Sequence, residues 1–180
     1  MSTTTADPST YRLPTTVVPH RYRLELTPDL GAATFAGDAE IEVTVNDAVD
    51  TITLNAAELD ITSAELTGPS GRTLATTGVD LDEEEERATL TFPEAVEKGP
   101  ATLHLTFTGI LNDKLHGFYR STFTDDAGVE HLIATTQMEA TDARRAFPCW
   151  DEPDRKAVFE VTLVIDENLA AYSNGPVIDE

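Results

Sequence analysis

Residues 135–153, which read TTQMEATDARRAFPCWDEP, contain side chains that could bind a small ligand. Gln137 and Glu139 stand two positions apart, so on a β-strand both would project from the same face. A carboxylate attracts an ammonium group, and the amide of Gln137 supplies a carbonyl acceptor beside it. The pair is therefore suited to hold a primary amine. The alternative is a solvated polar pair on an edge strand, and the chemistry alone favours that alternative.

The same stretch carries charges that are better suited to bracing a loop than to touching a ligand. They lie among apolar side chains, where an unpaired charge would be costly. We therefore expect ion pairs within this group, which consists of Asp142, Arg144, Arg145, Asp151 and Glu152.

The composition limits the classes of partner. The chain has 180 residues, enough for one large domain, with 33 acidic and 12 basic residues and a net charge of -21. Nucleic acid and anionic membranes are poor partners for a protein with such a negative charge, whereas a cationic ligand would be attracted. The densest acidic run, residues 82–86, is expected to be a solvated loop rather than a metal site. No stretch approaches the ~18 apolar residues of a membrane span.

Cys149 is the single cysteine, which excludes an internal disulfide framework and is typical of a reducing compartment. It lies between Pro148 and Trp150, so we expect a buried, inert thiol rather than a catalytic nucleophile. Residues 1–10 have neither the basic nor the apolar part of a signal peptide and are expected to be a disordered lead-in. These features predict a cytoplasmic protein.

Alternation of apolar and polar residues predicts strands along most of the chain. No window has a convincing helical period, apart from one possible turn in residues 143–147. The run Asp125–Gly128 predicts a hairpin turn. Short strands separated by Gly and Pro indicate an all-β fold, a large antiparallel β-sandwich over residues 11–180. The expected strands cover residues 21–26, 35–45, 52–54, 61–67, 87–92, 102–108, 118–123, 131–137 and 157–165.

The run TQMEATDARRAFPCWDEP resembles the signature of the amino-terminal domain of the M1 family of zinc aminopeptidases, of the aminopeptidase N and puromycin-sensitive type. The segments VPHRYRLEL (18–26), TFAG (34–37) and GFYRS (117–121) are similar to further elements of that domain. The resemblance implies a saddle-like β-sandwich. It also implies that Gln137 and Glu139 contact the free amino group of a peptide substrate, which reverses the choice that the chemistry alone favours.

The family's zinc motif is H-E-x-x-H on a helix, where two histidines share one face. None of the four histidines, His20, His104, His116 and His131, begins such a motif. The resemblance therefore implies that zinc is a cofactor of the full-length enzyme and that this chain, truncated before the catalytic domain, binds none and is inactive alone. The implied partners are the N-terminus of a peptide substrate and the missing catalytic domain, with no nucleic acid and no membrane.

Two other classes of protein stay open. A non-catalytic M1-like interaction scaffold would share the fold, although it has no need of an intact Q-x-E pair. A stand-alone β-sandwich binding module would share the strand pattern, although the signature stretch argues against it. An H-E-x-x-H motif in any sequence that follows residue 180 would favour the enzyme over both.

Overall fold

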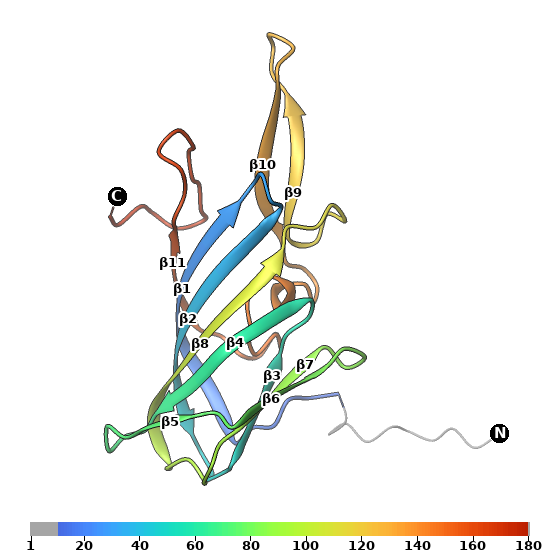
Figure 1. The fold of residues 1–180 in the computed structure, drawn as a ribbon. Coiled ribbons are helices and arrows are strands. Elements are labelled where there is room, and N and C mark those ends of the chain that lie inside the picture. The colour runs from blue at the N-terminus through green and yellow to red at the C-terminus, as the bar shows by residue number, and fades with distance from the viewer. Residues whose placement is uncertain (1–10, 180) are drawn as a thin grey trace, which may run out of the picture.

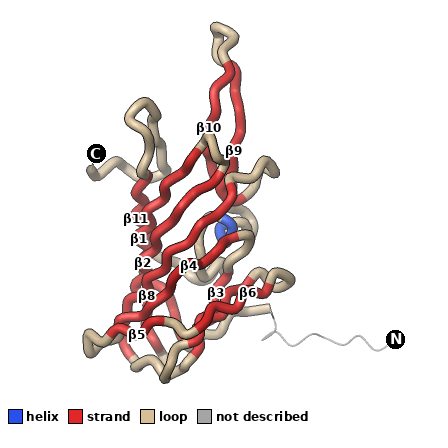
Figure 2. Tube along the Cα trace, in the orientation of Figure 1, coloured by secondary structure: helices blue, strands red, loops and turns tan. Residues whose placement is uncertain are grey.

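A computed structural model describes residues 11–179 of the chain, so the expected lead-in at residues 1–10 lies outside the described residues. The described part is built almost wholly of strands, as Figure 2 shows. The all-β prediction is confirmed. Within residues 11–179, the structure contains no helix with the length and apolar character that crossing a membrane requires.

The largest element is a six-stranded sheet (Figure 1). Neighbouring strands are antiparallel, except that the edge strand at the C-terminal end runs parallel to its neighbour. In spatial order the strands are β11 (Val158–Leu163), β1 (Val17–Asp29), β2 (Thr34–Val45), β8 (Gly99–Ile110), β4 (Leu59–Thr67) and β5 (Thr73–Ala75).

The core lies on one face of this sheet. Successive side chains of a strand point to opposite faces, so the alternating apolar residues of β2 and β8 all reach the same side. A three-stranded sheet packs there, formed by β3 (Thr51–Asn55), β7 (Arg87–Thr91) and β6 (Gly78–Asp82). The buried residues 146–150 join the same core cluster. The signature stretch is thus partly a core element.

A hairpin extends beyond one end of the large sheet (Figure 1). It consists of β9 (Gly117–Thr124) and β10 (Glu130–Gln137). Asp125 closes its turn by accepting hydrogen bonds at Oδ1 from the backbone N–H groups of Ala127 and Val129, both at 2.9 Å. The predicted hairpin turn is confirmed. A single turn of 3₁₀ helix, η2 (Ala143–Arg145), follows β10 where the sequence predicted one helical turn.

Each of the nine predicted strands is present, and the structure adds two strands that were not predicted, β5 and β6. Both are short, and neither contains a fully buried residue. A strand without a buried face leaves no alternating pattern to detect. The parallel pairing of β11 with β1 was also not expected.

Candidate functional site

Gln137 is the last residue of β10, where it pairs with Gly117 at the start of β9. Glu139 lies beyond the strand, in the turn that follows, and the Glu139–Ala140 peptide bond is cis. The two side chains therefore do not share a strand face as expected, although both are exposed and close in sequence. The carbonyl of Met138 accepts a hydrogen bond from the N–H of Asp142 at 2.9 Å and closes the turn.

Arg144 is largely buried, with 12% of its side chain exposed. Its Nε donates to Oδ2 of Asp151 at 3.0 Å, and its Nη1 donates to Oε2 of Glu86 at 3.2 Å. A guanidinium removed from water needs such partners, because a buried unpaired charge is strongly unfavourable. Arg144 thus ties the segment after η2 to the turn between β6 and β7.

Arg145 makes a second set of ion pairs and is 17% exposed. Its Nε donates to Oδ1 of Asp142 at 3.0 Å, its Nη1 donates to Oε1 of Glu58 at 2.9 Å, and its Nη2 donates to Glu86. Glu86 therefore bridges both arginines. We call these six residues the arginine cluster: Glu58, Glu86, Asp142, Arg144, Arg145 and Asp151.

The arginine cluster packs directly under the strands that carry Gln137. Gly117 has a φ of +65°, and a Cβ at this position would lie 2.6 Å from Cβ of Arg145. A larger residue at Gly117 would therefore collide with η2, and its backbone would be strained. Because Gly117 is the register partner of Gln137, the close contact fixes the end of β10 against the cluster.

Glu152 belongs to a separate ionic group near the start of the chain. Its carboxylate accepts hydrogen bonds from the backbone N–H of Leu13 at 2.7 Å and from Nε of Arg12 at 3.3 Å, and it lies 3.6 Å from Nε of Arg155. Ion pairs within the group are confirmed for Arg144 with Asp151 and for Arg145 with Asp142. Glu152 is also paired, but its partners Arg12 and Arg155 lie outside the group in which pairing was expected.

Gln137 and Glu139 differ from these neighbours. Within residues 11–179, the side chain of neither residue makes a hydrogen bond or an ion pair, and both are exposed. In particular, Glu139 is not a partner of Arg144 or Arg145, whose donors are directed to other carboxylates. An acceptor at the end of β10 and a carboxylate in the following turn thus stand open to solvent beside the arginine cluster.

Cys149 is 4% exposed, as the sequence predicted for an inert thiol. Burial, with a smaller contribution from Asp151, raises its pKa well above the ordinary value. The thiol is therefore protonated at neutral pH and is a poor nucleophile. Its backbone pairs in both directions with the buried Asn55, which holds the segment against the core.

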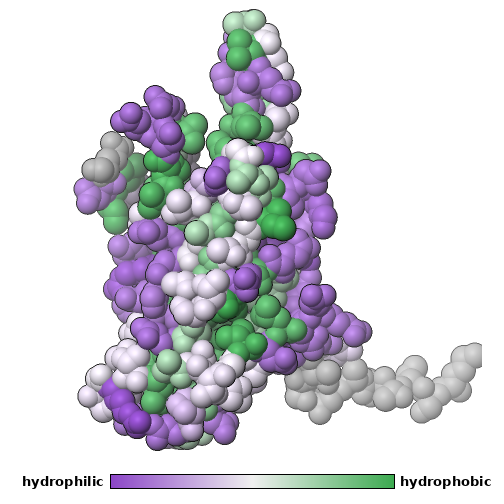
Figure 3. Space-filling model, viewed as in Figure 1, coloured by the Kyte–Doolittle hydropathy of each residue, from purple (hydrophilic) through white to green (hydrophobic). Residues whose placement is uncertain are grey.

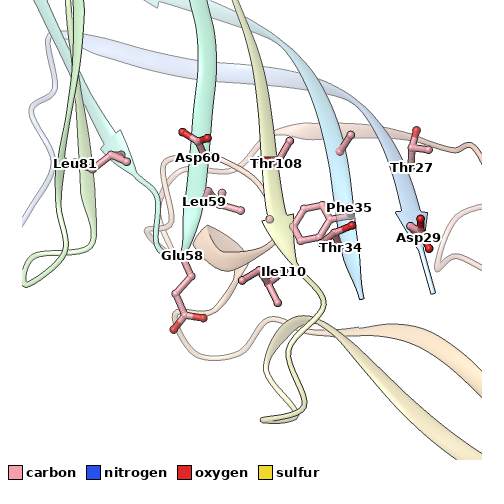
Figure 4. A pocket seen from close by; sticks show the side chains of 12 residues that line it. Thr27, Asp29, Thr34, Phe35, Glu58, Leu59, Asp60, Leu81, Thr108 and Ile110 are labelled. Carbon is pink, nitrogen blue, oxygen red and sulfur yellow. The ribbon is translucent and has the colours of Figure 1, made fainter. Parts of the chain in front are cut away.

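Two hollows lie near the site. The larger, about 670 Å³, is open and lies at the ends of several strands, with Phe35 and Leu59 among its apolar lining and Glu58 and Asp60 among its carboxylates (Figure 4). Its lining includes neither Gln137 nor Glu139. The smaller, about 200 Å³, is lined by Ala140, the neighbour of Glu139, together with aromatic residues of β1, β11 and the signature stretch. The lining of the smaller hollow does not include Gln137 or Glu139 either, so neither hollow is formed by the predicted amine site.

The histidines do not form a metal site. His20 bonds to Thr44, His104 to Asp38 and His131 to Asp125, each in a different place on the sheets. Among residues 11–179, no three His, Cys, Asp or Glu side chains are grouped so that they could hold a metal ion. The donors of residues 11–179 do not fit the zinc that the resemblance implies for the full-length enzyme.

The acidic run is a turn whose members have two different roles. Asp82 accepts hydrogen bonds at Oδ1 from the backbone N–H groups of Glu84 and Glu85, both at 3.0 Å, in an exposed turn. Glu86 instead points to the arginine cluster and has only 28% of its side chain exposed. The expectation of a solvated loop is wrong for Glu86, because its arginine partners are more than fifty positions away in sequence.

The chain is similar in sequence to several known aminopeptidases. The chain is 46% identical over 172 residues to Aminopeptidase M1 of Arabidopsis thaliana, covering 94% of this chain and 20% of the relative. It is 44% identical to mitochondrial Aminopeptidase 2 of Saccharomyces cerevisiae over 173 residues, covering 93% and 18%. It is 40% identical to the puromycin-sensitive aminopeptidase of Caenorhabditis elegans over 169 residues, covering 94% and 18%.

The chain thus spans about one fifth of the length of these relatives. Residues 18–180 match the sequence model of the peptidase M1 N-terminal domain. That match takes in the six-stranded sheet, the hairpin and the braced turn with Gln137 and Glu139. The chain belongs to the peptidase M1 family, and its described residues are those of the family's N-terminal domain.

Proposed function

We propose that this chain is the N-terminal domain of a longer zinc-dependent aminopeptidase, and that Gln137 and Glu139 anchor the α-ammonium group of a peptide substrate. One observation carries the assignment. Within the described part of the chain, the bracing charges of this stretch are paired, while Gln137 and Glu139 are exposed and have no protein partner. A carboxylate and an amide carbonyl left open are the acceptors that an ammonium group requires.

The contribution of this domain would be binding and orientation. Holding the substrate's N-terminus at a fixed point limits which peptide bond can reach the catalytic groups. Zinc in such enzymes polarises the scissile carbonyl and activates water. We propose that the zinc ligands lie in another part of the longer protein, because the donors of residues 11–179 do not fit a metal ion. The 180-residue chain alone should therefore not hydrolyse aminoacyl substrates.

The test is Glu139→Gln in the full-length enzyme. The substitution keeps the shape of the side chain but removes a charge-assisted contact of roughly 1.5–3 kcal/mol. We expect kcat/KM for peptides with a free N-terminus to fall by about tenfold to hundredfold. The melting temperature should not change, because the substitution breaks no hydrogen bond or ion pair between Glu139 and another described residue.

Glu130→Gln is the matched control, because Glu130 is an exposed carboxylate at the first residue of β10, the strand that precedes the turn with Glu139. It should leave kcat/KM unchanged. In the Glu139→Gln enzyme, kcat/KM for substrates whose amine is acetylated should fall much less than kcat/KM for peptides with a free N-terminus. Equal loss on both substrate types would reject the amine anchor, and so would equal behaviour of the two variants.

A cytoplasmic location is part of the proposal. Its support is the single, buried Cys149, which is typical of proteins that fold without disulfides. One relative is named as mitochondrial, so the location needs its own test. Fractionation of the source cells, with detection of the full-length protein, provides it.

A further inference from the structure

The larger hollow, of about 670 Å³, extends across four neighbouring strands of the six-stranded sheet, β1, β2, β8 and β4. Its lining includes a row of register partners, one from each strand: Thr27, Ala36, Thr108 and Asp60. All four are exposed, so they lie on the face of the sheet that points away from the core. The hollow is therefore open to solvent along its whole width.

Two carboxylates without a cationic partner stand at opposite sides of this hollow. Asp60 makes no hydrogen bond or ion pair with another of residues 11–179. Asp29 accepts a hydrogen bond at Oδ1 from the N–H of Ala32 at 2.8 Å, which leaves Oδ2 without a partner in the described part of the chain. Figure 4 shows Asp29 on one side and Asp60 on the other, with Phe35 between them.

The lining between the two carboxylates suits an aliphatic chain that also carries donors. It contains the exposed apolar side chains of Leu81 and Ile110, and the hydroxyl groups of Thr27, Thr34 and Thr108. These hydroxyls make no hydrogen bond with another of residues 11–179, so each can accept one from a ligand. No Lys, Arg or His among the described residues lines the hollow. Figure 3 shows white and green residues in the middle of the molecule, below the hairpin and where β8 ends in Figure 1, with purple residues on both sides.

The separation of Asp29 and Asp60 sets the length of a ligand that reaches both. Their strands, β1 and β4, are three positions apart in the sheet, which corresponds to about 14 Å at a strand spacing of about 4.8 Å. An extended aliphatic chain advances about 1.2 Å per bond, as an extended backbone does, so roughly twelve bonds bridge the hollow. Such a ligand has a cation at each end and methylene groups between them. A metal ion is a poor occupant, because no three donors of residues 11–179 are grouped to hold one.

We propose that the larger hollow binds a linear polyamine of the length of spermine. The terminal ammonium groups pair with Asp29 and Asp60, the inner ammonium groups donate to the threonine hydroxyls, and the methylene groups lie over the apolar lining. The net charge of -21 raises the local concentration of such a polycation. The proposal is independent of the amine anchor, because neither Gln137 nor Glu139 lines this hollow.

The test is calorimetric titration of the full-length protein with spermine at about 0.15 M salt, where attraction beyond about 8 Å is largely screened. We expect saturable binding at one site. Asp29→Asn and Asp60→Asn should each raise Kd about threefold to fivefold, and the double variant about tenfold or more, because each loses an exposed ion pair. Asn keeps a carbonyl that can accept the hydrogen bond from Ala32, so the turn after β1 is preserved.

Asp50→Asn is the matched control, because Asp50 is an exposed carboxylate beyond the opposite end of β2, with no side-chain partner in the described part of the chain. It removes the same charge and should leave Kd unchanged. Putrescine is too short to reach both carboxylates, so it should bind at least about tenfold more weakly than spermine.

Three results would overturn the proposal. Equal losses in Asp50→Asn and Asp60→Asn would show diffuse attraction to an acidic protein. Equal affinities of putrescine and spermine would show that no ligand bridges the hollow. Tighter binding of a short lysine peptide than of spermine, with the same sensitivity to Asp29→Asn and Asp60→Asn, would assign the hollow to a basic peptide instead.

Discussion

Replacing Arg144 by Met tests whether the arginine cluster holds the signature stretch in place. Met has a similar length and an apolar stem, so the change removes the charge while much of the packing is kept. Arg144 donates to Asp151 at 3.0 Å and to Glu86 at 3.2 Å. The variant leaves Asp151 without its arginine, while Glu86 keeps its bond to Arg145.

The expected loss follows from the burial of these groups. The side chain of Asp151 is 14% exposed and that of Arg144 is 12% exposed, so the pair is poorly screened by water. Removing one partner of a buried pair destabilises a protein by roughly 3–5 kcal/mol. Because Glu86 is more exposed, at 28%, and stays paired, we expect a loss of about 2–4 kcal/mol. For a domain of this length the loss corresponds to a fall of about 4–16 °C in melting temperature.

Arg72→Met is the matched control. Arg72 also pairs with a carboxylate, Glu94, but the side chains are 62% and 48% exposed. Exposed pairs contribute roughly 0–1 kcal/mol, so this variant should unfold close to the wild type. Urea unfolding followed by tryptophan fluorescence gives the free energy for both, since Trp150 is the single Trp and is buried.

A double-mutant cycle with Asp151→Asn separates the pair from general disruption. The coupling free energy between Arg144 and Asp151 should be about 1–3 kcal/mol, within the range for residues in contact. Equal losses in Arg144→Met and Arg72→Met, or a coupling near zero, would show that the cluster does not brace the stretch.

Two further outcomes follow from the packing. Gly37→Ala should destabilise the protein by about 1–3 kcal/mol in urea unfolding, because a Cβ there would lie 2.2–2.8 Å from the ring of Phe107. Gly78→Ala is the control and should be close to neutral, because nothing lies within 4 Å of a Cβ at that position. Similar losses of stability in both variants would contradict the reasoning. Native Cys149 should stay unreactive towards maleimide at pH 8. Burial raises the pKa of Cys149 in the folded protein, so the thiol of the unfolded chain ionises first as the pH rises. The melting temperature should therefore fall between about pH 8 and 10, and it should fall less in Cys149→Ala. Rapid labelling of the native protein would contradict a buried, protonated Cys149.

The strand pattern and the main turns could be predicted from the sequence because they depend on residues that are close together in the chain. The alternating apolar residues of β2 and β8 share one face whatever the rest of the chain does, since a strand repeats every two residues. The hairpin turn at Asp125 is closed by bonds within four positions. The resemblance that singled out Gln137 and Glu139 likewise depends on a continuous run of residues. Local information was sufficient for each of these.

The partners of the two arginines were decided only by the tertiary structure. Arg144 and Glu86 are 58 positions apart, and Arg145 and Glu58 are 87 apart, so no local pattern could assign them. If Arg144 and Arg145 had paired only with carboxylates of residues 135–153, Glu86 would lie in a solvated loop. Instead, the β6–β7 turn brings Glu86 against η2. The parallel pairing of β11 with β1 is equally non-local, as it joins the first and the last strand of the chain. An alternating pattern identifies which face of a strand is buried, but the neighbour of that strand depends on how the complete chain packs.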